Sequence, residues 1–296
     1  MTRVLQAEVA VPAQCELAEG PIWDRRLGVL RWVDILAGHV HSFDPASGER
    51  NWFDAGVPVG AVGLTSSGGL VLALVDGFAL LTGEPSDGWT VTRFGGFSTD
   101  RSAVRFNDGK PDPWGNFWAG TMAWAEGAPG GALYRLSPDG TVTTMLPDVA
   151  LSNGLDWTDD RRTFYFADSL SGGVDAFDCD PGSGALGERR RFVSVPDAGC
   201  VPDGLTLDSE GCLWLAVFGS GELRRFTPDG RLDTVVRLPA RQVTSAAFGG
   251  PGLGTLYITT ARENFTEADR RAEPHAGDIF ACVPGVSGRP SLHFAA

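Results

Sequence analysis

The sequence predicts an all-β fold, a six-bladed β-propeller with four-stranded antiparallel blades around a central tunnel. The chain of 296 residues contains four stretches that resemble one another and two fainter copies. The copies begin 41, 47, 46, 50 and 42 residues apart, at Glu19, Gly60, Asn107, Asn153, Asp203 and Ser245. A repeat of roughly 40–50 residues that carries several short strands is typical of a propeller blade.

A second landmark keeps the same phase. The prolines of four turns lie 26, 31, 28 and 25 residues after the openings of units one, three, four and five, at Pro45, Pro138, Pro181 and Pro228. Each of these turns ends in glycine, as tight turns often do. No stretch shows sustained helical periodicity, and only Glu263–Arg271 is expected to hold a helical turn.

The fifth unit shows the pattern of strands most clearly. A short strand follows Asp203, and an Asp-Ser-Glu-Gly turn leads to a second, wholly apolar strand over 213–217. Residues 222–226 alternate as a half-exposed strand, and a last strand covers 231–237. The other units follow this order, so we expect one domain over residues 1–296 in which each blade buries its faces against its neighbours. Closing the ring requires the chain ends to share a blade, and Val4–Val11 is the expected extra strand beside the last unit.

Composition argues against several classes of partner. The net charge is −13, which opposes binding to nucleic acid or to an anionic membrane. No segment approaches the roughly 18 apolar residues of a membrane span, and the first 20 residues lack the apolar core of a signal peptide. We therefore expect a cytoplasmic protein with no obligatory protein partner. The five scattered cysteines form no CxxC pair and favour free, mostly buried thiols.

Several common catalytic motifs are missing from the sequence. There is no G-x-S-x-G elbow, no phosphate-binding P-loop and no HExxH. The four histidines are too scattered for a zinc cluster, although His39 and His41 share one strand face. Lys110 is the single lysine, and its place in a turn-like segment favours a structural role over Schiff-base chemistry.

What remains is a set of oxygen ligands. Glu19, Asn153 and Asp203 open units one, four and five, and the first strand of each blade lines the tunnel. Their side chains should therefore converge at its mouth. Two carboxylates and a carboxamide suit one hard divalent cation such as Ca²⁺, Mg²⁺ or Mn²⁺, and oxygen-only sites also accept Zn²⁺. The alternative is that each side chain caps a strand, but clustered unpaired carboxylates are costly without a counter-ion.

Two residues of the third unit are candidates for contact with a substrate. Asn107 opens this unit and could be a fourth metal ligand or a substrate contact. Arg105 lies two residues earlier, so the two side chains would share a face of the strand. The Arg105 guanidinium could hold hydroxyls or a developing carboxylate, or it could form an ion pair with Asp100 or Asp108.

At these residues the chain resembles the gluconolactonase/regucalcin (senescence marker protein) family of sugar lactonases. The resemblance covers nearly the whole chain. Its most specific segments are AEGPIWD over 18–24, RFNDGKPDPWGNFWAGTM over 105–122, SNGLDW over 152–157 and PDGLTLDSEGCLW over 202–214.

The resemblance implies a six-bladed propeller with one catalytic divalent metal and hydrolysis of a sugar lactone. It places the metal on Glu19, Asn153 and Asp203, gives Asp203 the acid/base role, and makes Arg105 and Asn107 substrate contacts. Alternatives within the same fold are hydrolysis of another ester-like substrate, such as an organophosphate or a larger lactone, and calcium binding without catalysis. Animal relatives have a substrate-contacting Glu shortly after the GTM, where this chain has Trp124 and Glu126 instead. The sugar preference therefore depends on which of these two residues shapes the pocket.

Overall fold

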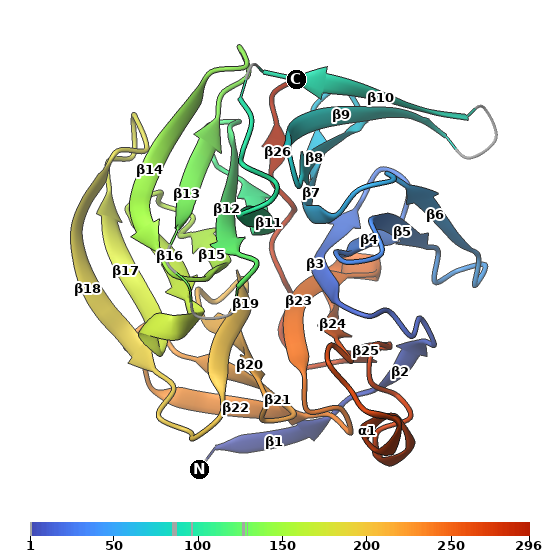
Figure 1. The fold of residues 1–296 in the computed structure, drawn as a ribbon. Coiled ribbons are helices and arrows are strands. Elements are labelled where there is room, and N and C mark those ends of the chain that lie inside the picture. Colours follow the sequence, from blue (N-terminus) through green and yellow to red (C-terminus); the bar gives the residue numbers. More distant parts are fainter. Residues whose placement is uncertain (1, 85–87, 96, 126–127, 129) are drawn as a thin grey trace.

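The protein folds into a ring of six small sheets. The computed structural model describes residues 2–84, 88–95, 97–125, 128 and 130–296. Within these residues each sheet is mainly antiparallel, and the sheets follow one another around the ring in chain order (Figure 1). The predicted six-bladed β-propeller is therefore confirmed.

The first four blades are each built around four consecutive strands. Blade one contains β3 (Ala18–Asp24), β4 (Val29–Asp34), β5 (His39–Phe43) and β6 (Arg50–Asp54). Blade two contains β7 (Val59–Thr65), β8 (Leu70–Leu74), β9 (Gly77–Glu84) and β10 (Gly88–Phe94). Blade three contains β11 (Val104–Pro111), β12 (Phe117–Ala123), β13 (Gly131–Leu136) and β14 (Val142–Val149). Blade four contains β15 (Ser152–Trp157), β16 (Thr163–Asp168), β17 (Gly173–Cys179) and β18 (Leu186–Ser194), with the 3₁₀ turn η1 (Ser169–Ser171).

The last two blades also use the chain ends. Blade five contains β19 (Val201–Leu207), β20 (Leu213–Phe218), β21 (Glu222–Phe226), β22 (Leu232–Arg237) and the parallel strand β1 (Arg3–Gln6). Blade six contains β23 (Val243–Gly249), β24 (Thr255–Thr260), β25 (Ile279–Cys282) and β2 (Glu8–Val11), together with η2 (Pro251–Leu253) and α1 (Glu267–Ala272). The short strand β26 (His293–Phe294) pairs in parallel with β7 of blade two.

The N-terminal segment corrects one expectation. As predicted, the chain start completes the last blade, because β2 pairs with β25. The segment 4–11 is not one strand, however. It divides near Ala7, whose backbone N–H donates to the Arg237 carbonyl at 3.1 Å, and β1 extends blade five instead. The N-terminus thus links the last two blades.

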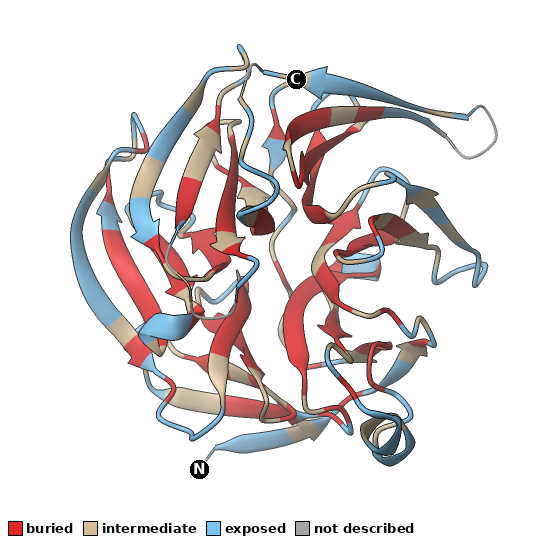
Figure 2. Cartoon of the chain, viewed as in Figure 1, coloured by how far each residue is buried: buried red, intermediate tan, exposed pale blue. Residues whose placement is uncertain are grey.

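Burial follows the position of a strand within its blade. Every residue of β7 and β8 is buried, as their apolar sequences VGAVGLT and LVLAL require between neighbouring blades. The outer strand β18, LGERRRFVS, is exposed at most positions. Figure 2 shows this gradient from red inner strands to pale blue outer ones. Apolar strands therefore surround the tunnel, and any polar group on them is conspicuous.

One turn recurs in blades three and five with the same hydrogen bonds. Asp208 accepts the N–H groups of residues 210 and 212 on Oδ1 and the indole N–H of Trp214 on Oδ2. Asp112 accepts those of residues 114 and 116 and the indole of Trp118 in the same way. Gly211 and Gly115 adopt φ of 74° and 84°, which favours glycine. The sequence D-x-x-G-x-x-W thus fixes the turn and orients a buried tryptophan.

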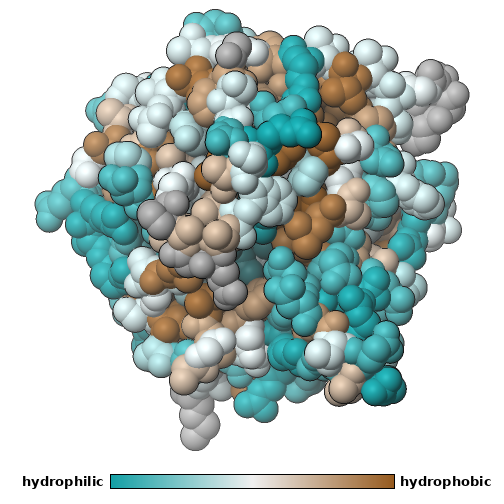
Figure 3. All heavy atoms as spheres, in the orientation of Figure 1, coloured by the Kyte–Doolittle hydropathy of each residue, from teal (hydrophilic) through white to brown (hydrophobic). Residues whose placement is uncertain are grey.

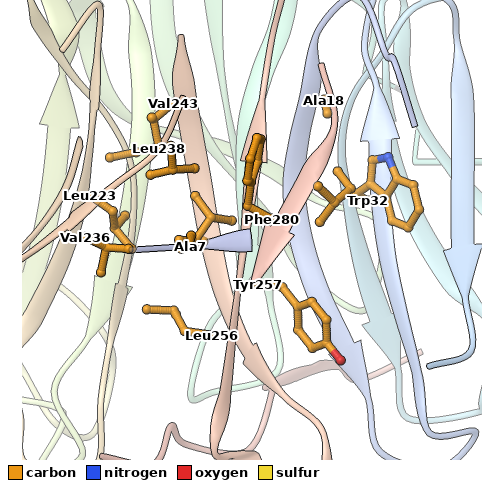
Figure 4. Packing of buried hydrophobic residues seen from close by; sticks show 14 of the residues in the cluster. Ala7, Ala18, Trp32, Leu223, Val236, Leu238, Val243, Leu256, Tyr257 and Phe280 are labelled. Atoms are coloured by element: carbon orange, nitrogen blue, oxygen red, sulfur yellow. The ribbon is translucent and has the colours of Figure 1, made fainter. Parts of the chain in front are cut away.

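The hydrophobic core lies between adjacent blades. Its largest cluster joins blades five, six and one, and Figure 4 shows Leu223 and Val236 with Leu256, Phe280 and Trp32 in this region. Trp32 and Phe280 are fully buried. Each blade is therefore stabilised by apolar contacts with its neighbours.

The face seen in Figure 3 carries both hydrophilic and hydrophobic residues. Figure 3 shows hydrophilic residues gathered at the lower right, where Figure 1 places α1 and blade six. The helix begins with a capping box, in which Thr266 and Asp269 hydrogen bond reciprocally. Of the described helices, none is long and apolar enough to cross a membrane. The five cysteines are free, as expected.

Candidate functional site

All six inner strands are irregular at the same point. The pairing of each inner strand with the next strand shifts register there, at residues 19–22, 59–61, 106–108, 152–155, 202–205 and 243–245. A β-bulge redirects the side chains at its position and recurs beside active sites. The six bulges coincide with the six unit openings, so these side chains share one level of the tunnel.

The sixth position carries the buried hydroxyl of Ser245, and four of these equivalent positions carry a buried acid or amide side chain. They are Glu19, Asn107, Asn153 and Asp203, whose exposed fractions are 2–5%. Gly154 and Gly204 follow two of them. A Cβ on Gly154 would lie 2.4 Å from the Leu205 nitrogen, so glycine is required for β15 and β19 to approach this closely. The glycines therefore bring Asn153 and Asp203 onto adjacent strands in close contact.

Two carboxyl groups of this set have raised pKa values. Burial and the charges of Asp203 and Asp108 raise the pKa of Glu19 well above its usual range. Burial and the Asp108 charge raise the pKa of Asp203 as well, although the polar groups of Glu19 and Asn153 act in the opposite direction. The protein environment alone therefore disfavours two negative charges here, and a proton or a cation must offset them.

The free oxygen atoms of this group fit a cation. Asn153 donates its Nδ2–H to Ser169 Oγ at 3.1 Å, which fixes the amide. Within the described residues, Asn153 Oδ1 and Asp203 Oδ1 are buried without a hydrogen-bond partner. Buried polar atoms are rarely left unpaired in native proteins. Two carboxylates and an amide oxygen with unused lone pairs form an all-oxygen donor set for a hard divalent cation.

Arg105 and Asn107 lie side by side on β11. Arg105 Nη1 donates to Asn107 Oδ1 at 2.6 Å and to the Phe106 carbonyl at 3.2 Å. Asn107 Nδ2 donates to the Ser152 carbonyl of blade four at 2.9 Å. Both ends of the Asn107 amide are therefore engaged. The carboxylate of Asp100, one expected partner of Arg105, instead accepts the N–H and hydroxyl of Ser102.

The Arg105 guanidinium has an unusual environment. It is 4% exposed, and burial lowers its pKa while the charges of Glu263, Glu19 and Asp203 act to raise it. The indole of Trp124 covers it, with 5.6 Å from the guanidinium carbon to the ring centroid. The guanidinium group therefore lies close to Glu19 and Asp203, and also to Glu263 of blade six.

Two residues near the site, Asp108 and Glu263, were not predicted as part of it. Asp108 is a third buried carboxyl, and burial raises its pKa to about 6 against the opposing charge of Lys110. Asp108 follows Asn107 in the bulge, a signal that the sequence contained. Glu263 comes from the loop before α1 and carried no such signal. Of the two residues expected to shape the pocket, Trp124 lies beside Arg105, and Glu126 lies outside the described residues.

A second polar cluster lies farther along the tunnel. A cavity of about 350 Å³ is lined there by Lys110, Asp156 and Arg289 among others. Lys110 Nζ donates to the Leu205 carbonyl at 3.1 Å and to Asp156 Oδ2 at 3.3 Å. Lys110 therefore links three blades, in keeping with the structural role expected of it.

The histidines of blade one belong to a separate group. The donor atoms of Cys15, Asp34 and His41 lie within 4.8 Å of one another. Both oxygens of Asp34 accept backbone N–H groups, from residues 16 and 17. Asp168 of blade four accepts those of residues 150 and 151 in the same way. Asp34 is therefore part of a repeated structural contact, and this group is distinct from the tunnel acids.

Comparison with known proteins gives a consistent result. The model of the family described as SMP-30/Gluconolactonase/LRE-like region matches residues 17–262. Regucalcin of Gallus gallus is 38% identical over 287 residues, covering 94% of this chain and 95% of the relative. YvrE of Bacillus subtilis (strain 168), which bears the provisional name sugar lactone lactonase, is 34% identical to this chain. The match covers 100% of this chain and 99% of YvrE.

A solved structure shares the whole architecture. The structure of regucalcin from Agrobacterium tumefaciens, described as a calcium-binding protein, superposes with a TM-score of 0.92. It is 26% identical and covers 100% of both chains. The match therefore extends over all six blades.

Proposed function

The chain belongs to the SMP-30/gluconolactonase/LRE-like family, and from this we propose that it is a metal-dependent hydrolase that opens a sugar lactone to the corresponding aldonic acid. One observation carries the proposal: two buried carboxyl groups and a fixed amide meet at equivalent bulges, with oxygen atoms that have no partner among the described residues. The provisional name of YvrE supports the substrate class.

In this proposal Glu19, Asn153 and Asp203 hold one divalent cation. When bound, such a cation polarises the lactone carbonyl and stabilises the negative charge that develops on its oxygen. The description of the Agrobacterium relative supports calcium, while the donor set also accepts magnesium, manganese or zinc.

The chain's own side chains supply the proton transfers and the orientation. Asp203 accepts a proton from the attacking water as its oxygen bonds to the carbonyl carbon. It returns that proton to the ring oxygen as the carbon–oxygen bond of the ring breaks, so the products are a carboxylic acid and a hydroxyl. Arg105 and Asn107, already aligned by their mutual hydrogen bond, contact the hydroxyls of the substrate.

The test is a screen of lactones against metals on chelator-stripped protein. Gluconolactone, xylonolactone and arabinolactone are offered with Ca²⁺, Mg²⁺, Mn²⁺ or Zn²⁺. We expect turnover only with metal, and a fall of at least about 100-fold in kcat for Asp203→Asn. Asp139→Asn, in an exposed turn, is the matched control. Full turnover in excess chelator, or near-normal turnover by Asp203→Asn, would discard the proposal.

The same screen separates the alternatives. Turnover of organophosphates or larger lactones in preference to sugar lactones would assign the site to another ester-like substrate. Calcium binding without turnover of any substrate would favour a calcium-binding propeller, in line with the description of the Agrobacterium relative.

A further inference from the structure

Trp124 is an exposed aromatic side chain that is nevertheless held in place. Its side chain lies after β12 and is 40% exposed. Its backbone N–H donates to the Ala103 carbonyl at 3.0 Å, and its indole Nε1–H donates to the Arg101 carbonyl at 3.0 Å. The backbone and the indole of Trp124 are thus both hydrogen bonded to the segment that leads into β11.

The segment that receives these bonds is itself a fixed turn. Asp100 Oδ1 accepts the backbone N–H of Ser102 at 3.0 Å and its hydroxyl at 2.6 Å. The Asp100 carbonyl accepts the N–H groups of Ala103 and Val104, both at 2.9 Å. Trp124 therefore loses little further freedom on contact with a ligand, which is the condition for an efficient binding surface.

The position of the ring connects it to the proposed site. The Arg105 guanidinium lies over the indole at 5.6 Å and is itself buried. Arg105 interacts electrostatically with Glu19 and Asp203. Trp124 therefore shields the guanidinium from water at the edge of the polar cluster, while much of its surface remains open.

The other tryptophans provide the contrast. Trp32, Trp118, Trp157 and Trp214 are the largest fully buried side chains of the core. Among the described residues, Trp52 is the other tryptophan with a large exposed fraction, 62%. It lies on the outer strand β6, next to His39 and His41 and away from the inner strands. Within the described part of the chain, Trp124 alone among the tryptophans combines an exposed indole with contact to a residue of the tunnel.

We propose that the exposed indole of Trp124 is the platform on which the sugar ring of the substrate lies, and thus a residue that sets specificity. This inference rests on the proposed lactonase function. The C–H bonds on one side of a sugar ring are weakly positive and apolar, so they pack well on the negative face of an indole. Arg105 and Glu263, at the edge of the same cluster, would then receive the hydroxyls.

Steady-state kinetics on gluconolactone with metal-loaded protein test the platform. Trp124→Ala should raise KM at least tenfold and change kcat less than threefold, and Trp124→Phe should keep KM within about threefold of the wild type, because phenylalanine retains an aromatic face. Trp52→Ala is the control, since it removes the exposed indole that lies away from the tunnel.

A binding measurement keeps this test separate from catalysis. The quenching of tryptophan fluorescence by 1,5-anhydro-D-glucitol, a sugar ring with no lactone to open, is titrated in the calcium-loaded protein. We expect saturable quenching in the wild type and in Trp52→Ala, and its loss in Trp124→Ala. Circular dichroism confirms that each variant is folded.

The outcomes distinguish the two proposals. If the wild type opens no lactone but binds the sugar ring through Trp124, the lactonase proposal fails and the platform stands. If the wild type is active and Trp124→Ala has an unchanged KM, the platform is overturned. A fall in kcat alone would overturn it as well, because it would show that Trp124 only positions Arg105.

Discussion

At the scale of single residues, the buried acids set function against stability. Glu19 and Asp203 are each protonated more readily in the folded chain than in the unfolded one. Burial raises the pKa of both, the charges of Asp203 and Asp108 raise that of Glu19 further, and the charge of Asp108 raises that of Asp203. Such sites lower the stability of a protein in exchange for a binding function. Substituting one of these acids should therefore change the stability and the function of the protein in opposite directions, and each can be measured separately.

Asp203→Asn is expected to stabilise the metal-free protein while it abolishes turnover. Between the ordinary carboxyl pKa and the raised folded one, the folded state binds more protons than the unfolded state. The free energy of unfolding of the wild type then falls as pH rises through this window and stays low above it. Removing the Asp203 charge removes part of that fall.

Melting curves in chelator at pH 4 to 8 measure this effect. The variant should melt above the wild type at pH 8 and near it at pH 4. Added Ca²⁺ should raise the Tm of the wild type by mass action and leave that of the variant nearly unchanged. A variant that melts below the wild type in chelator at pH 8 would show that the acids are not repelling one another.

His41 should produce the opposite dependence on pH. Burial lowers its pKa from 6.5 to about 4. Between these values the unfolded state binds more protons, so the free energy of unfolding should fall as pH drops from 6.5 to 4, by about 3 kcal/mol. His41→Phe keeps the ring that stacks on Trp32 and should remove this part of the acid sensitivity.

Urea unfolding at pH 7 and pH 4.5, with saturating metal, checks the assignment. His293→Gln, which alters an exposed histidine on β26, is the control. If His41→Phe loses as much stability as the wild type on acidification, another group is responsible.

The sequence predicted which residues form the site better than it predicted which groups surround them. The phase of the repeat indicated Glu19, Asn107, Asn153 and Asp203 as equivalent positions, and the structure places them at equivalent bulges. Their roles as ligands remain predictions. Glu263 could not be predicted, because it reaches Arg105 from a loop of another blade. Proximity of that kind depends on the closure of the ring and leaves no local pattern.

At the scale of the strand, the bulge and its glycine determine where a side chain points. Gly154 follows Asn153, and a Cβ there would lie 2.7 Å from the Asp203 carbonyl oxygen as well as against Leu205. These are backbone atoms of the next inner strand, so they cannot move aside individually. Inner strands without such glycines would stand farther apart and separate the proposed ligands.

Gly154→Ala should therefore damage both stability and the site. Overpacking typically costs about 1–3 kcal/mol, and the shift of β15 from β19 should weaken the binding of the proposed cation. Gly254→Ala is a suitable control, because its Cβ would meet only the Pro251 carbonyl at 3.7 Å and its φ is −91°. Urea unfolding and calcium titration measure the two effects. Normal calcium affinity in Gly154→Ala would show that strand spacing does not position the ligands.

The sequence predicted the bounds of the strands more closely than the pairing between them. In unit five the expected strand over 213–217 corresponds to β20, and the expected strand over 222–226 to β21. Apolar patterns and turn residues act locally, which makes such boundaries readable. The division of segment 4–11 between two blades depends on which edges are free, and no local pattern records that.

At the scale of the molecule, the last ten residues fasten the ring. Residues 287–296 run across the propeller (Figure 1) and contact every blade. Their partners, from blade one to blade six, are Trp23, the strand β7, Gly115, Asp156, Ser209 and Leu253. A ring of blades opens by separating two neighbours, and this segment opposes that separation at several junctions at once.

Arg289 makes three side-chain hydrogen bonds from this segment. It donates to the Trp157 carbonyl at 2.8 Å, to Asp159 Oδ1 at 2.6 Å and to Asp156 Oδ1 at 2.9 Å. Asp156 is buried, and Lys110 is its other cationic partner. Arg289→Ala should therefore cost about 3 kcal/mol, the usual result of leaving a buried carboxylate short of a partner.

The comparison of Arg289→Ala with Arg93→Ala tests whether the loss of stability depends on where the arginine lies or only on the loss of an ion pair. Arg93 also pairs with an aspartate, Asp76, but on the exposed surface of one blade, where an ion pair contributes at most about 1 kcal/mol. Deleting residues 287–296 should lower the Tm further than Arg289→Ala does, because all six blades lose a contact together. If the deletion and Arg93→Ala melt alike, the ring is held closed by the packing between blades alone, and the segment only covers one end of the tunnel.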